Sequence, residues 1–229
     1  MKYKLAALIL FFAIYEVAYG QTDSQIADFT KAAKFDDIAE VKSLVSAGVS
    51  PNSKDPKGNP MLIVAINDKS YKVIDYLLSN KATDPDLPNS NGETPLMIAS
   101  IDGDLGVVKT LVTQKKVAIN PVGWTPLHYA STRGNLEVAQ FLLANGAVVN
   151  ALSPSHTTPL MMAVQSGNDS LVKLLLDNGA DLKVRNTAGY SAIDVAALFD
   201  KEDIHSGLVS RWQKLYKEPY PGGPKPASH

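Results

Sequence analysis

The 229-residue chain contains no cysteine. A disulfide framework, a thiol nucleophile and a thiolate metal site are therefore excluded. A lipid-anchored lipoprotein is excluded as well, because its anchor requires a cysteine at the cleavage site.

The chain also lacks an excess of charge of either sign. It has 22 Lys and Arg against 23 Asp and Glu, which leaves a formal net charge of -1. Binding to nucleic acid or to an anionic membrane surface normally relies on a clear positive excess. The composition therefore gives no electrostatic case for either partner.

No apolar run is long enough to span a bilayer in a helix, which takes about 20 residues. The apolar run at residues 5–14 follows Lys2 and Lys4, and small residues precede Gln21. This pattern is typical of a cleaved export signal over residues 1–20, with an uncleaved membrane anchor as the alternative. The absence of cysteine from an exported protein fits a bacterial periplasm better than an animal extracellular space, and secretion is the other destination.

Four segments of the chain are nearly the same. They begin at Thr94, Thr125, Thr158 and Ser191, at intervals of 31, 33 and 33 residues, and three of them start with Thr-Pro-Leu. This period and signature resemble the ankyrin repeat family. The resemblance implies an all-α solenoid of helix-turn-helix repeats joined by β-turn or hairpin loops.

Apolar triples at i, i+3 and i+4 recur at the same period along the chain and predict the second helix of each repeat. The mature chain then holds about six repeats in one domain over residues 21–216, because each repeat buries its apolar face only against its neighbours. The terminal repeats are expected to act as caps, and residues 217–229, rich in proline, are expected to be a disordered tail. The six repeats are predicted at approximately 23–55, 56–88, 89–119, 120–152, 153–185 and 186–216.

Glycine is missing from two of the positions where second helices should end. Gly48, Gly146 and Gly179 occupy this position in three repeats, whereas Lys81 and Lys115 occupy it in the second and third. A glycine there allows the left-handed residue that closes a helix. Either the two lysines adopt that conformation at a cost of about 1 kcal/mol, or their helices end differently.

No constellation of residues indicates catalysis. In ankyrin repeats the histidine of the Thr-Pro-Leu-His segment is structural, so His128 is interpreted as a buried scaffold residue, and Met97, Met161 and Met162 as packing residues rather than soft-metal ligands. The best set of titratable groups for the opposing hypothesis, an enzyme or a small-molecule or metal binder, is Asp102, Arg133 and His156. We expect no enzyme activity, cofactor or metal.

Resemblance to ankyrin proteins implies that a partner lies along the concave side, on the turn tips and the ends of the first helices. Large side chains at these positions, such as Trp124, Tyr190 and Phe199, favour binding, although Leu198 and Phe199 could instead pack inside the C-terminal cap. The predicted partner-binding residues are Asn59, Asp68, Glu93, Ile101, Asp102, Trp124, Thr132, Arg133, Thr157, Gln165, Tyr190 and Phe199.

These expectations combine into one functional hypothesis. The chain is predicted to be an exported, monomeric, non-catalytic protein that binds one unidentified protein partner in its concave groove. Stabilisation or inhibition of a periplasmic enzyme is one role that such binding could serve. Nucleic acid and, after cleavage of the signal, membranes are not expected as partners.

Overall fold

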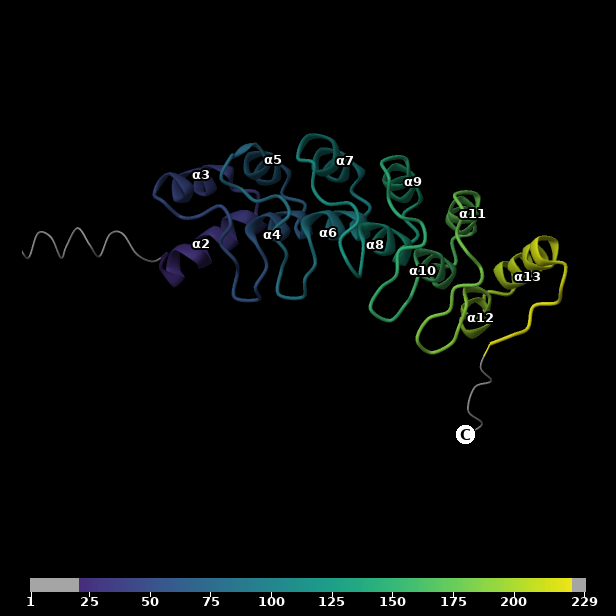
Figure 1. The fold of residues 1–229 in the computed structure, drawn as a ribbon. Coiled ribbons are helices and arrows are strands. Elements are labelled where there is room, and N and C mark those ends of the chain that lie inside the picture. Colours follow the sequence, from purple (N-terminus) through teal and green to yellow (C-terminus); the bar gives the residue numbers. More distant parts are fainter. Residues whose placement is uncertain (1–20, 224–229) are drawn as a thin grey trace, which may run out of the picture. The chain divides into compact units, whose positions relative to one another are not determined.

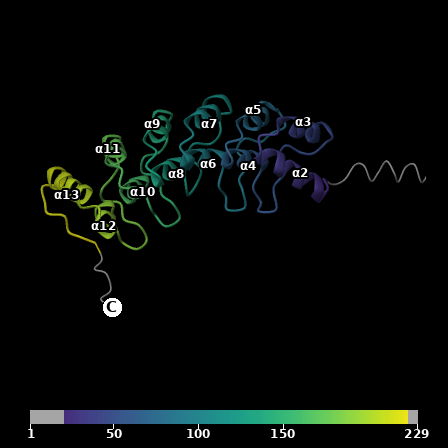
Figure 2. The same ribbon diagram turned by 180° about the vertical axis from the view of Figure 1, so that it is seen from behind.

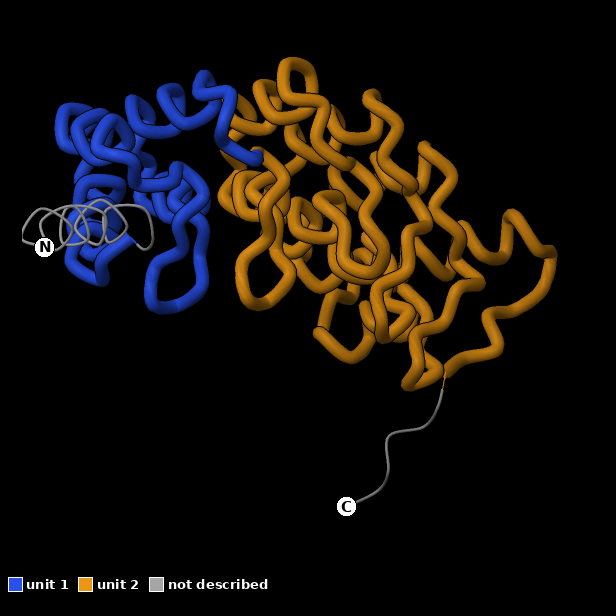
Figure 3. The backbone as a smooth tube through the Cα atoms, turned by 60° about the vertical axis from the view of Figure 1, so that its left-hand side comes forward, with its two compact units in different colours: residues 1–84 blue, residues 85–229 orange. Residues whose placement is uncertain are grey.

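The computed structural model describes residues 21–223, so the predicted export signal lies outside the described residues. The chain divides into two compact units, residues 1–84 and 85–229, shown in different colours in Figure 3. Within the described residues the fold is helical, apart from one isolated bridge between Lys54 and Pro60. The all-α architecture predicted from the repeats is confirmed.

The first unit contains two helix pairs. The helices are α2 (Asp23–Lys34), α3 (Ile38–Ser46), α4 (Met61–Asn67) and α5 (Tyr71–Ser79). The Thr22 hydroxyl accepts a hydrogen bond from the Gln25 backbone N–H, and the Gln25 side chain accepts one in return from the Thr22 N–H, which caps α2. Phe29 of α2 and Met61 of α4 are fully buried between the pairs.

The second unit contains four helix pairs (Figures 1 and 2). The first helices pack side by side in one layer, the second helices form another, and the connecting loops extend beyond the first helices. The elements, in order, are α6 (Pro95–Asp102), α7 (Leu105–Lys109) with η1 (Thr110–Gln114), α8 (Pro126–Thr132), α9 (Leu136–Ala144), α10 (Pro159–Ser166), α11 (Asp169–Asp177), α12 (Ala192–Leu198) and α13 (Glu202–Tyr216).

The repeated Thr-Pro dipeptide explains where the first helices of this unit begin. Proline occupies the first turn of α6, α8 and α10, where its missing N–H costs nothing and its φ is already helical. The hydroxyls of Thr94 and Thr158 each accept a hydrogen bond of 3.3 Å from the backbone N–H three residues later. Ser191 takes the same role at the start of α12.

Asparagine side chains connect neighbouring repeats of the second unit. Nδ2 of Asn150 donates to the Gly179 carbonyl (3.0 Å), and Oδ1 accepts from the Asp181 N–H (2.9 Å). Asn120 makes the equivalent pair of bonds one repeat earlier, to Gly146 and Val148. These hydrogen bonds satisfy backbone N–H and C=O groups of the loops, which have no partner within a helix.

The apolar triples predicted for the second helices form the core. Their members are buried or partly buried in every repeat, and Leu77, Leu111, Leu142 and Leu175 are completely buried. In the last helix Ile204, Leu208 and Trp212, at the spacing i, i+4, i+8, are buried. The cap helix α13 therefore covers the end of the core as expected.

The two unusual lysines do not adopt the left-handed conformation. Helix α5 ends at Ser79, with Asn80 extended, so Lys81 lies beyond the helix end. In the third repeat a π-helical turn, η1, adds one residue, so that Lys115 stays helical (φ -92°) and Lys116 takes the left-handed position (φ 58°). The alternative in which these helices end differently is confirmed, and the third repeat is shifted by one residue.

Residues 217–223 differ from the disorder expected of the C-terminal tail. The Gly222 carbonyl accepts a hydrogen bond from Arg185 (2.9 Å), and the Tyr220 hydroxyl donates one to Asp194 (2.6 Å). Composition alone did not reveal these partners, because they are 20 or more residues away in sequence. Residues 224–229 lie outside the described part of the chain.

Candidate partner-binding surface

The predicted partner-binding residues are divided between the two units. Asn59, in the loop before α4, and Asp68, which follows α4, belong to the first unit. The Asn59 N–H and side-chain amide both donate to Asp55, so this residue supports its own turn. The other ten lie in the second unit, on loops or at the ends of first helices.

Three of those ten meet at one apolar hollow. It has a volume of about 210 Å³ and is lined by Ile101 of α6, Trp124 of the loop before α8, Tyr129 and Thr132 of α8, and Met162 of α10. Side chains from three successive repeats therefore form a single depression. The prediction supplied Ile101, Trp124 and Thr132, and the fold adds Tyr129 and Met162.

His128 holds Trp124 in place beside this hollow. The two rings meet edge to face, with centroids 5.2 Å apart and an angle of 77° between their planes. His128 itself is completely buried, whereas Trp124 remains 37% exposed. The tryptophan is thus a supported but open side chain.

The histidine is fixed in one neutral form. Its Nδ1 accepts a hydrogen bond from the Thr125 backbone N–H (3.2 Å), and Nε2 lies 2.9 Å from the Thr157 carbonyl oxygen. Because the N–H can only donate and the carbonyl can only accept, the ring proton is on Nε2. Burial lowers the pKa of His128, and its hydrogen bonds to backbone carbonyls oppose that shift. The predicted scaffold role of His128 is confirmed.

Tyr129 also lines the hollow, and its hydroxyl is held by Glu93, which is not one of the lining residues. Its hydroxyl donates to Oε1 of Glu93 (3.0 Å), while Oε2 of Glu93 accepts from the Asn89 side chain (2.8 Å). Burial raises the pKa of Tyr129, and the bond to the Glu93 carboxylate adds to that shift. Tyr129 is therefore a neutral donor at any physiological pH, and Glu93 acts here as a positioning residue.

A family model described as "Ankyrin repeats (3 copies)" matches residues 29–121, 81–153, 115–186 and 149–215. The chain belongs to the ankyrin repeat family. Ankyrin repeats are generally protein–protein interaction modules, which agrees with an open apolar hollow on the surface formed by loops and first helices.

Curated relatives share the repeats but are much longer proteins. The mouse ankyrin repeat and SAM domain-containing protein 6 is 30% identical over 121 residues, which is 51% of this chain and 13% of that protein. Human neurogenic locus notch homolog protein 2 is 33% identical over 118 residues, 51% of this chain and 5% of that protein. The palmitoyltransferase AKR1 of Lachancea kluyveri is 31% identical over 121 residues, 51% of this chain and 16% of that protein. The chain thus spans a small part of each relative, so their whole-protein activities do not transfer to it.

The remaining predicted residues surround the hollow or extend beyond it. Asp102, Arg133 and Gln165 are exposed at the ends of first helices, and Thr157 and Tyr190 are partly buried on loops. Leu198 and Phe199 are 46% and 44% exposed, so they do not form the interior of the C-terminal cap. The surface formed by the loops and first-helix ends of the second unit thus exposes apolar side chains at several separate points, one of which is the hollow.

Two kinds of residue escaped the sequence interpretation. Tyr129 and Met162 lie in the middle of first helices, where the repeat pattern predicts buried core residues. Only the packing of three successive repeats leaves part of each side chain lining the hollow. Phe35, which follows α2, is 76% exposed and occupies the same position in its repeat as Phe199. It could have been found by extending the alignment of first-helix ends into the first repeat.

The residues of the enzyme hypothesis lie on one turn and at the ends of two helices. His156 lies at a turn with φ 56°, in the position where other repeats have left-handed glycines such as Gly123 and Gly189, whereas Asp102 and Arg133 lie at helix ends. Over residues 21–223 no group of three or more His, Asp or Glu side chains could hold a metal ion. Met97 and Met161 are buried in the core, in agreement with packing. In the same range no helix has the length and apolarity needed to cross a membrane.

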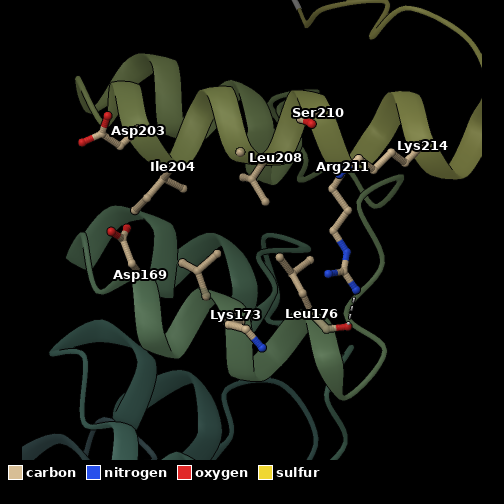
Figure 4. Close-up of a pocket in the computed structure, with 11 residues that line it drawn as sticks. Asp169, Lys173, Leu176, Asp203, Ile204, Leu208, Ser210, Arg211 and Lys214 are labelled. Atoms are coloured by element: carbon tan, nitrogen blue, oxygen red, sulfur yellow. Dashed lines mark hydrogen bonds between the residues drawn. The ribbon is translucent and has the colours of Figure 1, made fainter.

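A second depression of the second unit lies between α11 and α13 (Figure 4). It measures about 360 Å³ and has Ile204, Leu208 and Leu176 at its base. Asp169 and Asp203 lie in the first turns of the two helices, where carboxylates stabilise a helix start. The two carboxylates of this groove are thus accounted for by the starts of its own helices, and its basic lining residues are Lys173, Arg211 and Lys214.

Proposed function

We propose that the chain is a non-catalytic binding protein that holds one protein partner on the loops and first helices of its second unit. The observation that carries this proposal is the apolar hollow around Trp124. An open tryptophan braced by a buried histidine resembles the rigid aromatic anchors on which binding energy concentrates. Family membership supports a protein as the partner.

The size of the hollow supports a protein side chain as its occupant. Sites for small molecules and cofactors usually measure about 300–1,000 Å³. At about 210 Å³ the hollow falls below that range and is lined almost entirely by apolar groups. One apolar side chain of the partner, inserted among Ile101, Trp124 and Met162, would bury these surfaces from water.

We further propose the cellular setting expected from the sequence. The pattern of residues 1–20 supports export, and the absence of cysteine supports the bacterial periplasm. The protein would act there as a monomer on a single partner, for instance by stabilising or inhibiting a periplasmic enzyme. No enzymatic reaction is assigned to the chain itself.

Site-specific photocrosslinking tests the proposed surface. A benzoylphenylalanine placed at Thr132, on the edge of the hollow, should capture one major protein in the exported fraction. The same group at Lys173, an exposed residue of α11, serves as the matched control and should not capture it. Equal capture of the same protein from both positions, or capture from Lys173 alone, would refute the proposed surface.

A further inference from the structure

Within residues 21–223 the sixth repeat is the last one of the stack. In the fourth repeat two contacts reach forward: Nε2 of His128 to the Thr157 carbonyl, and Asn150 to the Gly179 and Asp181 backbone. The last repeat has Asp194, three residues after Ser191, in the position of His128, and the fifth repeat ends with Lys183, four residues after Gly179, in the position of Asn150. Both forward contacts are therefore chemically different at this end of the protein.

The C-terminal segment supplies a partner at the first of these positions. The Tyr220 hydroxyl donates to Oδ2 of Asp194 (2.6 Å) and lies 2.6 Å from the Ser191 hydroxyl. The same Asp194 oxygen accepts from Nη1 of Arg185 (3.0 Å) and from the Ser191 backbone N–H (2.8 Å). The hydroxyl of Tyr220 thus completes the buried start of α12, where Asp194 stands in the histidine position.

Lys183 likewise finds its partner near the end of the chain. Its ammonium lies 4.1 Å from the centre of the Tyr216 ring, within cation–π range. The Tyr216 and Tyr220 rings both pack on Trp212, at 4.4 Å and 5.1 Å between centroids. Asp194 of the last repeat and Lys183 of the fifth are thereby linked to one aromatic cluster formed by α13 and the segment after it.

The end of the segment fits closely against the repeat. Arg185 donates through Nη2 to the Gly222 carbonyl (2.9 Å) and through Nη1 to the Gly189 carbonyl (2.7 Å). A Cβ atom on Gly223 would lie only 2.5 Å from Cγ of Asp194. Glycine is therefore required at this position for the backbone to approach the carboxylate.

We infer that residues 216–223 are a latch that takes the place of the next repeat. At Asp194, the position from which His128 holds the repeat after it, the segment supplies the Tyr220 hydroxyl instead of a loop carbonyl, and Tyr216 contacts Lys183 at the end of the fifth repeat. Exposed terminal repeats otherwise offer an unpaired stacking face, and a face that accepts another copy head to tail leads to open-ended assembly. The latch covers that face with the segment that follows α13.

Release of the latch can be read from Trp212. The chain has two tryptophans, Trp124 and Trp212, so Trp124→Phe makes Trp212 the sole indole reporter. In this background, a chain that ends at Lys217 should emit at longer wavelength because Trp212 loses the Tyr220 ring. Amide exchange at Ser191, Ile193 and Asp194 should quicken about tenfold, as expected for losing a hydrogen bond to a charged acceptor.

Two point variants make the test independent of truncation. Tyr220→Phe removes only the hydroxyl and should speed exchange at the same three amides, and Gly223→Ala should do so by colliding with Asp194. Gly207→Ala is the control, because a Cβ on Gly207 of α13 would meet no atom within 4 Å. If the emission and the exchange rates of Tyr220→Phe and Gly223→Ala match those of Gly207→Ala, the latch is refuted.

Discussion

The π-helical turn of the third repeat predicts opposite effects for the same substitution at two adjacent residues. Lys116 has φ 58°, a conformation that costs a non-glycine residue about 1–2 kcal/mol. Glycine removes that cost but gives back about 0.5–1 kcal/mol through its greater freedom in the unfolded chain. Lys116→Gly should therefore raise the free energy of unfolding by about 0.5–1 kcal/mol.

At Lys115 the sign reverses. This residue is helical, with φ -92° and its N–H donating to the Thr110 carbonyl (3.1 Å). Glycine in a helical position costs about 0.8–1 kcal/mol relative to alanine, so Lys115→Gly should destabilise the protein. The two variants should thus differ by roughly 1.5 kcal/mol in unfolding free energy.

Urea denaturation followed by circular dichroism measures this difference. With an m-value of about 1–3 kcal/mol/M, the two midpoints should be separated by roughly 0.5–1.5 M. Lys81→Gly serves as a control, because Lys81 is neither helical nor left-handed and its glycine variant should gain nothing. A higher midpoint for Lys115→Gly than for Lys116→Gly would show that the π-helical turn is absent.

Three further predictions concern the scaffold and the export signal. The pKa of His128 is lowered in the folded protein, so the unfolded chain binds more protons below about pH 6.5. The free energy of unfolding should therefore fall as the pH drops through that range. The urea midpoint should fall between pH 8 and pH 5, and it should fall less in the His128→Gln variant than in the wild-type protein. Asn150→Ala breaks two bonds between repeats and should cost about 1–3 kcal/mol by the same assay, whereas a change below 0.5 kcal/mol would argue against the asparagine connection. Mass spectrometry of the exported protein should find Gln21 as its first residue, and a species that begins at Met1 in the membrane fraction would instead indicate an anchor.

Periodic features were predictable from the sequence because each repeat meets the same packing constraint. The Thr-Pro starts, the apolar triples and the left-handed His156 all follow from a residue's position in the repeat. The shift of the left-handed position from Lys115 to Lys116 was not predictable, because one inserted residue can either form a π-helical turn in the helix or lengthen the following loop. Only the hydrogen-bond pattern of the folded chain distinguishes the two.

The sequence predicts the candidate site only in part, because some of its residues are brought together by contacts between distant segments. Trp124, Ile101 and Thr132 were predicted from loop and helix-end positions, but Met162 joins them only because α10 packs beside α8. The role of Tyr220 depends similarly on where the chain returns after α13. A proline-rich composition suggests disorder on average and carries no information about one well-placed hydroxyl.

The central claim is that the hollow around Trp124 binds the partner. Once photocrosslinking has identified that partner, titration calorimetry should show Trp124→Ala weakening its binding by about 1–4 kcal/mol, with Lys173→Ala unchanged. Circular dichroism melting should confirm that the Trp124→Ala protein is folded, since the side chain contacts His128 only at a ring edge. A folded Trp124→Ala variant that binds its partner as tightly as the wild-type chain would contradict the account.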